Sequence, residues 1–161
     1  MQMDRDDFRR SVQPLYSAFQ GLQYVDQMFK ALDNPNGTLD QLSTGLRRLV
    51  SDHTGYRDSK VTISTVGQAI VSRAIEEMES TKQFPDAYIG NLKSSLLGYF
   101  QNADDARKAV SVIATRINQR LGNFIGRENV PDIGDFGQLE RSKEKLGGIE
   151  PSKTKAGKFR D

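Results

Sequence analysis

The chain contains no cysteine and no tryptophan, and only one of its 161 residues is histidine. Without cysteine there is no disulfide, no thiolate zinc site and no thiol nucleophile. A single imidazole, that of His53, also excludes every site that requires two histidines. Any acid–base or metal chemistry would therefore have to use carboxylates, and we expect no cofactor and no metal site.

Long apolar runs are absent as well. No stretch approaches the ~18 uninterrupted apolar residues of a membrane-spanning helix. The first ten residues, MQMDRDDFRR, are charged where a signal peptide would be apolar. With 36% hydrophobic and 27% charged residues and a mean hydropathy of -0.61, the composition is typical of a soluble globular domain. We expect no membrane-spanning segment and no secretion signal.

The net charge of the chain is small, but the charged residues are unevenly distributed along it. The formal net charge of +2 is too small to indicate a nucleic-acid-binding protein by itself. Residues 141–161 carry a net +4, whereas the other 140 residues carry −2. A basic tail on a mildly acidic body is typical of a segment that contacts a polyanion or an acidic groove. A solvated, lysine-rich terminus explains the same pattern equally well.

Apolar residues recur every three or four positions in five segments, which is the signature of amphipathic helices. The segment Val61-Thr62-Ile63 is too short for a strand, so we expect an extended lead-in to a helix there. Short connections favour antiparallel neighbours, and the sequence predicts an all-α bundle of about five antiparallel amphipathic helices. The first predicted helix is Pro14–Leu32. The second opens at the capping box Thr38-Leu39-Asp40-Gln41 and ends near Asp52, and the third is capped by Ser64 or Thr65 and ends before Phe84. The fourth runs from Pro85 to about Gln101, and the fifth is capped by Asn102 and ends at Gly126.

The composition divides the chain into a leader (1–13), a helical bundle (14–126) and a C-terminal arm (127–161). Seven of the 14 glycines fall in residues 122–161, and only a short helix near 138–146 is predicted in the arm. The arm is too short to bury its apolar residues alone, so we interpret them as anchors for a partner. These anchors are Ile133, Phe136, Leu139, Leu146, Ile149 and Phe159.

Two sequence features raise the question of catalysis. His53 follows Ser51 and Asp52, but no G-x-S-x-G sequence is present to expose a nucleophilic serine, so we interpret His53 as a helix-end residue that caps carbonyls or faces water. The pair Glu79-Ser80 resembles the Glu-Ser pair of lytic transglycosylases, in which the acid protonates a glycosidic oxygen. The Gly- and Gln-containing motif of those enzymes is missing downstream, and we interpret the pair as a solvated helix end.

Basic residues near the end of the last predicted helix form a candidate nucleic-acid surface with the tail. Aromatic residues are few in this region, which favours contact with the charged backbone over base stacking. The candidate polyanion contacts are Arg116, Arg120, Arg127, Lys153, Lys155, Lys158 and Arg160.

The chain reads as a cysteine-free, Gln-, Asn- and Ser-rich helical bundle followed by a Gly-rich charged arm. Between residues 49 and 126 this texture includes SDHTG (51–55), EEMES (76–80) before FPD (84–86), and NADDAR (102–107). Over about half of the chain it resembles helical regions of internal or ejected virion proteins of tailed bacteriophages. The resemblance implies a structural component near the portal, the tail or the packaged DNA, with a role in assembly or DNA ejection and no catalytic residue.

The leading hypothesis is a non-enzymatic structural or assembly protein, located in a virion or in the host cytoplasm. Its helical body would form a homo-oligomer or join a larger assembly, with the arm lying on a neighbouring subunit. The alternative is a nucleic-acid-binding or packaging accessory protein that uses the basic tail. A third hypothesis is a small glycan-cleaving enzyme with a carboxylate site, for which Glu79 is the candidate.

Overall fold

The computed structural model describes residues 4–131 and confirms the all-α fold class. Strand-like structure within this range is limited to a single isolated bridge between Thr38 and Thr62. Three short 3-10 turns supplement the α-helices. The elements are α1 (Arg5–Ser11), α2 (Gln13–Ala31), η1 (Leu39–Gln41), α3 (Thr44–Thr54), α4 (Ile63–Ser80), α5 (Asp86–Ser95), η2 (Leu96–Phe100), α6 (Ala103–Ile125) and η3 (Arg127–Asn129).

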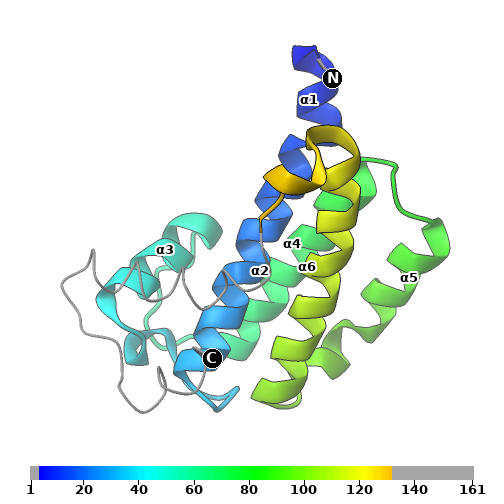
Figure 1. Ribbon diagram of the computed structural model, residues 1–161. Helices are drawn as coiled ribbons and strands as arrows, with labels where there is room; N and C mark the ends of the chain where they lie inside the picture. The colour runs from blue at the N-terminus through cyan, green and yellow to red at the C-terminus, as the bar shows by residue number, and fades with distance from the viewer. Residues whose placement is uncertain (1–3, 132–161) are drawn as a thin grey trace.

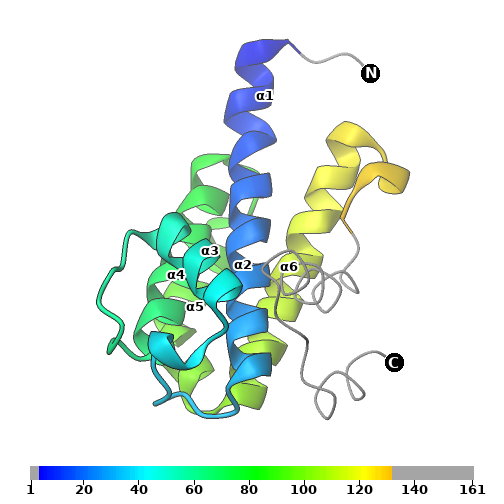
Figure 2. The ribbon, with the colours of Figure 1, turned by 90° about the vertical axis from the view of Figure 1, so that its left-hand side faces the viewer.

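Helix α2 is the centre of the bundle and packs mainly against α4 and α6 (Figure 1). The chain direction alternates through α2, α4, α5 and α6, as short connections require (Figure 1). Helix α3 lies to one side of α2, and α5 packs outside α4. Figure 2 shows that α1 extends α2 beyond the other helices, and none of the residues of α1 is buried.

The core forms along the facing apolar stripes of α2, α4 and α6. Phe29 of α2 and Phe100 of η2 pack with ring centroids 5.7 Å apart, directly over Gly67 of α4. A Cβ on Gly67 would lie 2.7 Å from Phe100, so only glycine lets the two rings pack this closely against α4. The largest fully buried side chains are Phe29, Leu15, Leu22, Met28, Leu39, Leu46, Ile63, Ile70, Ile75, Met78, Ile113 and Ile117.

The second predicted helix begins later than the sequence indicates. The capping box at Thr38 is present, but it closes only the 3-10 turn η1, and α3 begins at Thr44 with Ser43 as its N-cap. The amide of Leu39 donates to the carbonyl of Val61 (3.1 Å), and η1 is followed by Leu42, whose backbone is extended with a ψ of 158°. This pairing with the segment before α4 buries Leu39 on η1 rather than on α3.

Helix α4 also starts at a different residue from the one predicted. Its N-cap is Thr62, which accepts a hydrogen bond from the amide of Thr65, rather than Ser64 or Thr65. The amide of Ile63 donates to the carbonyl of Gly37 (2.8 Å), which aligns the chain for the first turn. The expectation of an extended lead-in at 61–63 is confirmed for Thr62, while Val61 lies in a bend and Ile63 already belongs to the helix.

The last two predicted helices differ in how well their ends were placed. The fourth is α-helical only to Ser95 and continues as the 3-10 turn η2 to Phe100. The fifth agrees with prediction: Asn102 accepts a hydrogen bond from the amide of Asp105 (2.8 Å), and α6 ends at Gly126, whose φ of +88° favours glycine. Asx capping and a glycine stop are local features, which is why the sequence places them correctly.

Candidate functional site

The two catalytic hypotheses lead to side chains with structural roles. The imidazole of His53 packs edge-on against the ring of Tyr24 (5.4 Å between centroids) and over Gly21 of α2. Burial, and then the charge of Arg73, lowers the pKa of His53 below its ordinary value. The carboxylate of Asp52 lies 3.8 Å from Arg57. His53 therefore serves to pack α3 against α2.

The electrostatic environment of Glu79 is the opposite of the one that the general acid of a glycosidase needs. Its carboxylate accepts a 2.8 Å hydrogen bond from the ammonium of Lys93 on α5. This hydrogen bond and the charge of Lys93 lower the pKa of Glu79, whereas a general acid needs a raised one. Among residues 4–131, no group of three or more His, Asp or Glu side chains is placed to hold a metal ion.

An apolar groove lies between α5, η2 and α6, and we call it the α5–α6 groove. It has a volume of about 520 Å³. Leu92 and Ile113 are buried, whereas Val112 is 66% exposed and Leu97 of η2 is 73% exposed. The residues that line the groove are Tyr88, Asn91, Leu92, Ser95, Gly98, Tyr99, Asp105, Lys108, Ala109, Val112 and Ile113.

The sequence does indicate an apolar surface here, through apolar residues that lie outside the apolar stripes of the helices. Val112 and Leu97 do not belong to the apolar stripes of their segments, because each directly precedes or follows a stripe position. An apolar residue off the stripe points away from the core and into solvent. Large exposed apolar side chains beside an apolar opening are typical of a contact surface.

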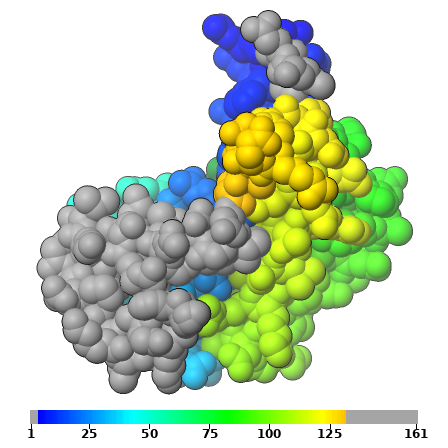
Figure 3. All heavy atoms as spheres, viewed as in Figure 1, coloured from blue at the N-terminus to red at the C-terminus, as the bar shows by residue number. Residues whose placement is uncertain are grey.

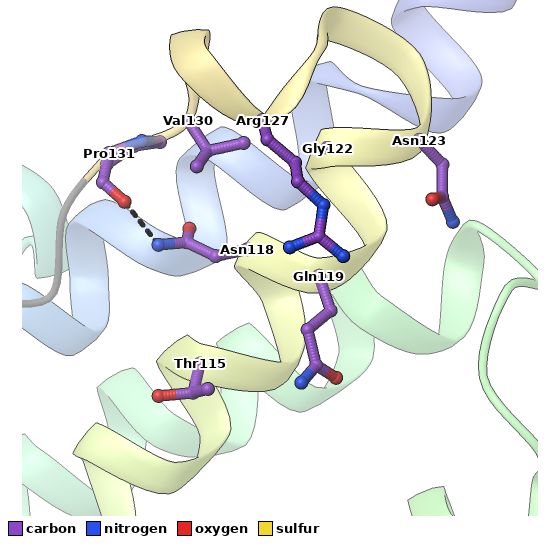
Figure 4. A pocket seen from close by; sticks show the side chains of 8 residues that line it. All are labelled: Thr115, Asn118, Gln119, Gly122, Asn123, Arg127, Val130 and Pro131. Carbon is purple, nitrogen blue, oxygen red and sulfur yellow. Dashed lines mark hydrogen bonds between the residues drawn. The ribbon is translucent and has the colours of Figure 1, made fainter.

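A second pocket, lined mostly by residues with polar side chains, lies at the end of α6 (Figure 4), and we call it the α6 terminal pocket. It has a volume of about 470 Å³. The side-chain amide of Asn118 donates to the carbonyl of Pro131, which holds the chain against α6 where it leaves the described residues. The lining residues are Thr115, Asn118, Gln119, Gly122, Asn123, Arg127, Val130 and Pro131, and none of them is acidic.

The three candidate arginines of the bundle are placed differently. The guanidinium of Arg116 lies 4.6 Å from the ring centroid of Tyr88, and that of Arg120 lies 5.7 Å from the ring centroid of Phe84. Arg116 and Arg120 lie in the C-terminal half of α6, toward the negative end of the helix dipole, and the last turn of α6 contains no basic residue. Arg127 follows the helix and lines the α6 terminal pocket.

The aromatic partners of these arginines are not predicted from the sequence. Phe84 and Tyr88 stack on each other with ring centroids 6.1 Å apart. The sequence predicts Tyr88 at the margin of a helix and uses Phe84 only as the residue before Pro85. Nothing local indicates that arginines some thirty residues later would cover these two rings.

The proposed sites in the arm lie outside the described residues. They are the apolar anchors Ile133, Phe136, Leu139, Leu146, Ile149 and Phe159, the basic residues Lys153, Lys155, Lys158 and Arg160, and the short helix near 138–146.

Within the described part of the chain, no helix has both the length and the apolar character required to cross a lipid bilayer. Comparisons with protein-family models, curated proteins and solved structures found no match. A function therefore has to be argued from the surfaces of the chain itself. The two surfaces that support such an argument are the apolar α5–α6 groove and the polar, basic end of α6.

Proposed function

We propose that this protein is a non-enzymatic structural or assembly protein that acts through protein–protein contacts. The observation that carries the proposal is the α5–α6 groove, which is lined by the largely exposed Val112 together with buried Leu92 and Ile113. Its charged and polar residues, such as Asp105 and Lys108, border apolar and aromatic ones. An apolar centre with aromatic residues and a polar rim is the composition of protein interfaces.

The occupant that we propose for the groove is the C-terminal arm of a second copy of this chain. The arm supplies apolar anchors such as Phe136 and Leu139, which a segment of that length cannot bury by itself. Pro131 lines a pocket with Gln13, Tyr16 and other residues of α2, so the chain leaves the bundle on the α2 side of α6. The groove lies on the α5 side, so α6 stands between Pro131 and the groove of the same copy, which favours the arm of a neighbouring copy as its occupant.

The larger assembly that we propose is the virion of a tailed bacteriophage, in an internal, portal-proximal or ejected position. This setting is supported only by the sequence resemblance of residues 49–126. Mass spectrometry of purified particles is the direct test. Recovery of the chain at a fixed number of copies per particle is expected, and its absence from purified particles would contradict the virion setting while leaving the contact role open.

The contact role is tested by the solution mass of the full chain, measured by light scattering. We expect an oligomer for the wild type and dissociation for Val112→Glu, because a carboxylate would be buried in an apolar contact. Phe136→Ser with Leu139→Ser in the arm should dissociate the oligomer equally.

The matched control is Phe8→Glu, which places the same charge on an apolar side chain of α1 that is 40% exposed. This variant should keep the wild-type mass. A monomeric wild type would contradict the proposal, and so would a groove variant that remains oligomeric.

A further inference from the structure

The C-terminal half of α6 has an outer surface made of hydrogen-bond donors, and the one acidic residue next to them in sequence is Glu128, which follows Arg127. Arg116, Gln119, Arg120 and Asn123 share one side of the helix, since they are spaced by three, four and seven residues. Arg127 follows at the end of the helix, and we call these five residues the donor face. No Asp or Glu occurs between residues 106 and 127.

The arginines of the donor face are not neutralised by carboxylates. The ion pairs within residues 4–131 do not include Arg116, Arg120 or Arg127. By contrast, Arg107 on the same helix is paired with Asp26. The donor face is also accessible, because Arg120 is half-buried and its other four members are exposed. Figure 3 shows the outer side of α6 at the surface of the molecule.

Stacking holds two of these cations in place. Arg116 lies over Tyr88 and Arg120 over Phe84, and the two rings stack on each other. The two arginines are four residues apart, so their positions on the helix are separated by about 6 Å along its axis. A guanidinium has five N–H donors, so Arg116 keeps donors for an anion even while it interacts with the Tyr88 side chain. The stack thus fixes two cations one helical turn apart before any ligand binds.

We propose that the donor face of α6 binds the phosphate backbone of a nucleic acid. Arginine, asparagine and glutamine side chains are the donors that proteins use toward phosphate oxygens. A row of cations without intervening acids matches a polymer with regularly repeated negative charge. The basic tail, with Lys153, Lys155, Lys158 and Arg160, adds charge of the same sign in the same chain. This activity does not depend on the contact role proposed above.

The test uses the full chain and a fluorescein-labelled random-sequence DNA duplex, with binding followed by fluorescence anisotropy in about 50 to 200 mM NaCl. We expect Arg116→Gln with Arg120→Gln to weaken binding about tenfold at the lower salt concentration. The slope of log K against log salt should fall by about 2, because two phosphate contacts are lost. Arg127→Gln should lower the slope by about 1.

The matched control is Arg47→Gln with Arg48→Gln, which removes the same charge from α3. The control should bind as the wild type does. Since glutamine also removes the stacking, Arg116→Lys with Arg120→Lys tests charge alone and should keep most of the salt dependence. Thermal unfolding of each variant shows whether the bundle is intact.

Four results would overturn the proposal. The first is an unchanged affinity in the Arg116 and Arg120 variant, and the second is an equal loss in the α3 control. In the third, a polyglutamate peptide of matched charge competes as well as unlabelled DNA, which would assign the donor face to an acidic protein segment. A variant with glutamine at 153, 155, 158 and 160 measures the contribution of the tail, and complete loss of binding in that variant alone would also refute the proposal.

Discussion

Arg107 of α6 donates a 2.9 Å hydrogen bond to the carboxylate of Asp26 on α2, across 81 residues of sequence. The Asp26 side chain is 5% exposed and that of Arg107 is 36% exposed. Burial raises the pKa of Asp26 above its ordinary value, although the charge and the hydrogen bond of Arg107 act to lower it. The pair thus joins the two longest helices of the described chain. The buried carboxylate of Asp26 would destabilise the fold without the guanidinium of Arg107.

We expect Arg107→Gln to lower the free energy of unfolding by about 3 kcal/mol at pH 7, because the buried carboxylate loses its hydrogen-bonded cation and keeps only the charge of Lys30 nearby. The loss should be smaller at pH 4. In the variant the pKa of Asp26 rises further, so protonation removes the uncompensated charge as the pH falls. Urea unfolding at the two pH values measures both effects.

The exposed Arg48→Gln on α3 serves as the control and should change the unfolding free energy by no more than about 0.5 kcal/mol. An Arg107→Gln variant as stable as the wild type at pH 7 would show that the ion pair contributes nothing.

His53 should make the fold less stable in acid. Because burial and Arg73 lower its pKa in the folded chain, the unfolded chain binds a proton more readily as the pH falls through the ordinary value. The contribution of neutral His53 is fully present above that value and is lost below it. We expect His53→Gln to reduce the fall in unfolding free energy between pH 7 and pH 5, measured by urea titration. An identical pH profile in wild type and variant would contradict the lowered pKa.

Gly67 should not tolerate even a methyl group. A Cβ there would meet Phe100 at 2.7 Å and Phe29 at 3.2 Å, so Gly67→Ala should destabilise the protein by about 1–3 kcal/mol. Gly90 in α5 has open space around the same position. Gly90→Ala should therefore stabilise by about 0.5–1 kcal/mol through helix propensity. Melting temperatures that shift in the same direction for both variants would refute the packing argument.

Gln27 is fully buried, and neither atom of its side-chain amide has a hydrogen-bond partner within the described residues. An unpaired buried amide costs about 1–3 kcal/mol. Gln27→Met has a similar shape without that cost and should raise the unfolding free energy by about this amount. The exposed Gln20→Met on the same helix should have little effect. Destabilisation by Gln27→Met would indicate that the amide is paired in solution.

The amino-acid sequence by itself determined the features that depend on neighbours along the chain. Apolar spacing of three and four residues is sufficient for an amphipathic helix, so the five predicted helices and the all-α class appear in the structure. The Asn102 cap and the glycine stop at Gly126 require only local hydrogen bonds and a local φ, and both were placed correctly.

Only the tertiary structure decided where distant segments meet. The amide of Leu39 pairs with the carbonyl of Val61, and α3 begins only at Thr44, a start that no local pattern shows. The stacking of Arg116 on Tyr88 likewise depends on how α5 lies against α6. Interactions between neighbours along the chain determine the backbone conformation of a residue. Which other helix its side chain contacts is determined by the packing of whole helices, which involves residues far apart in the chain.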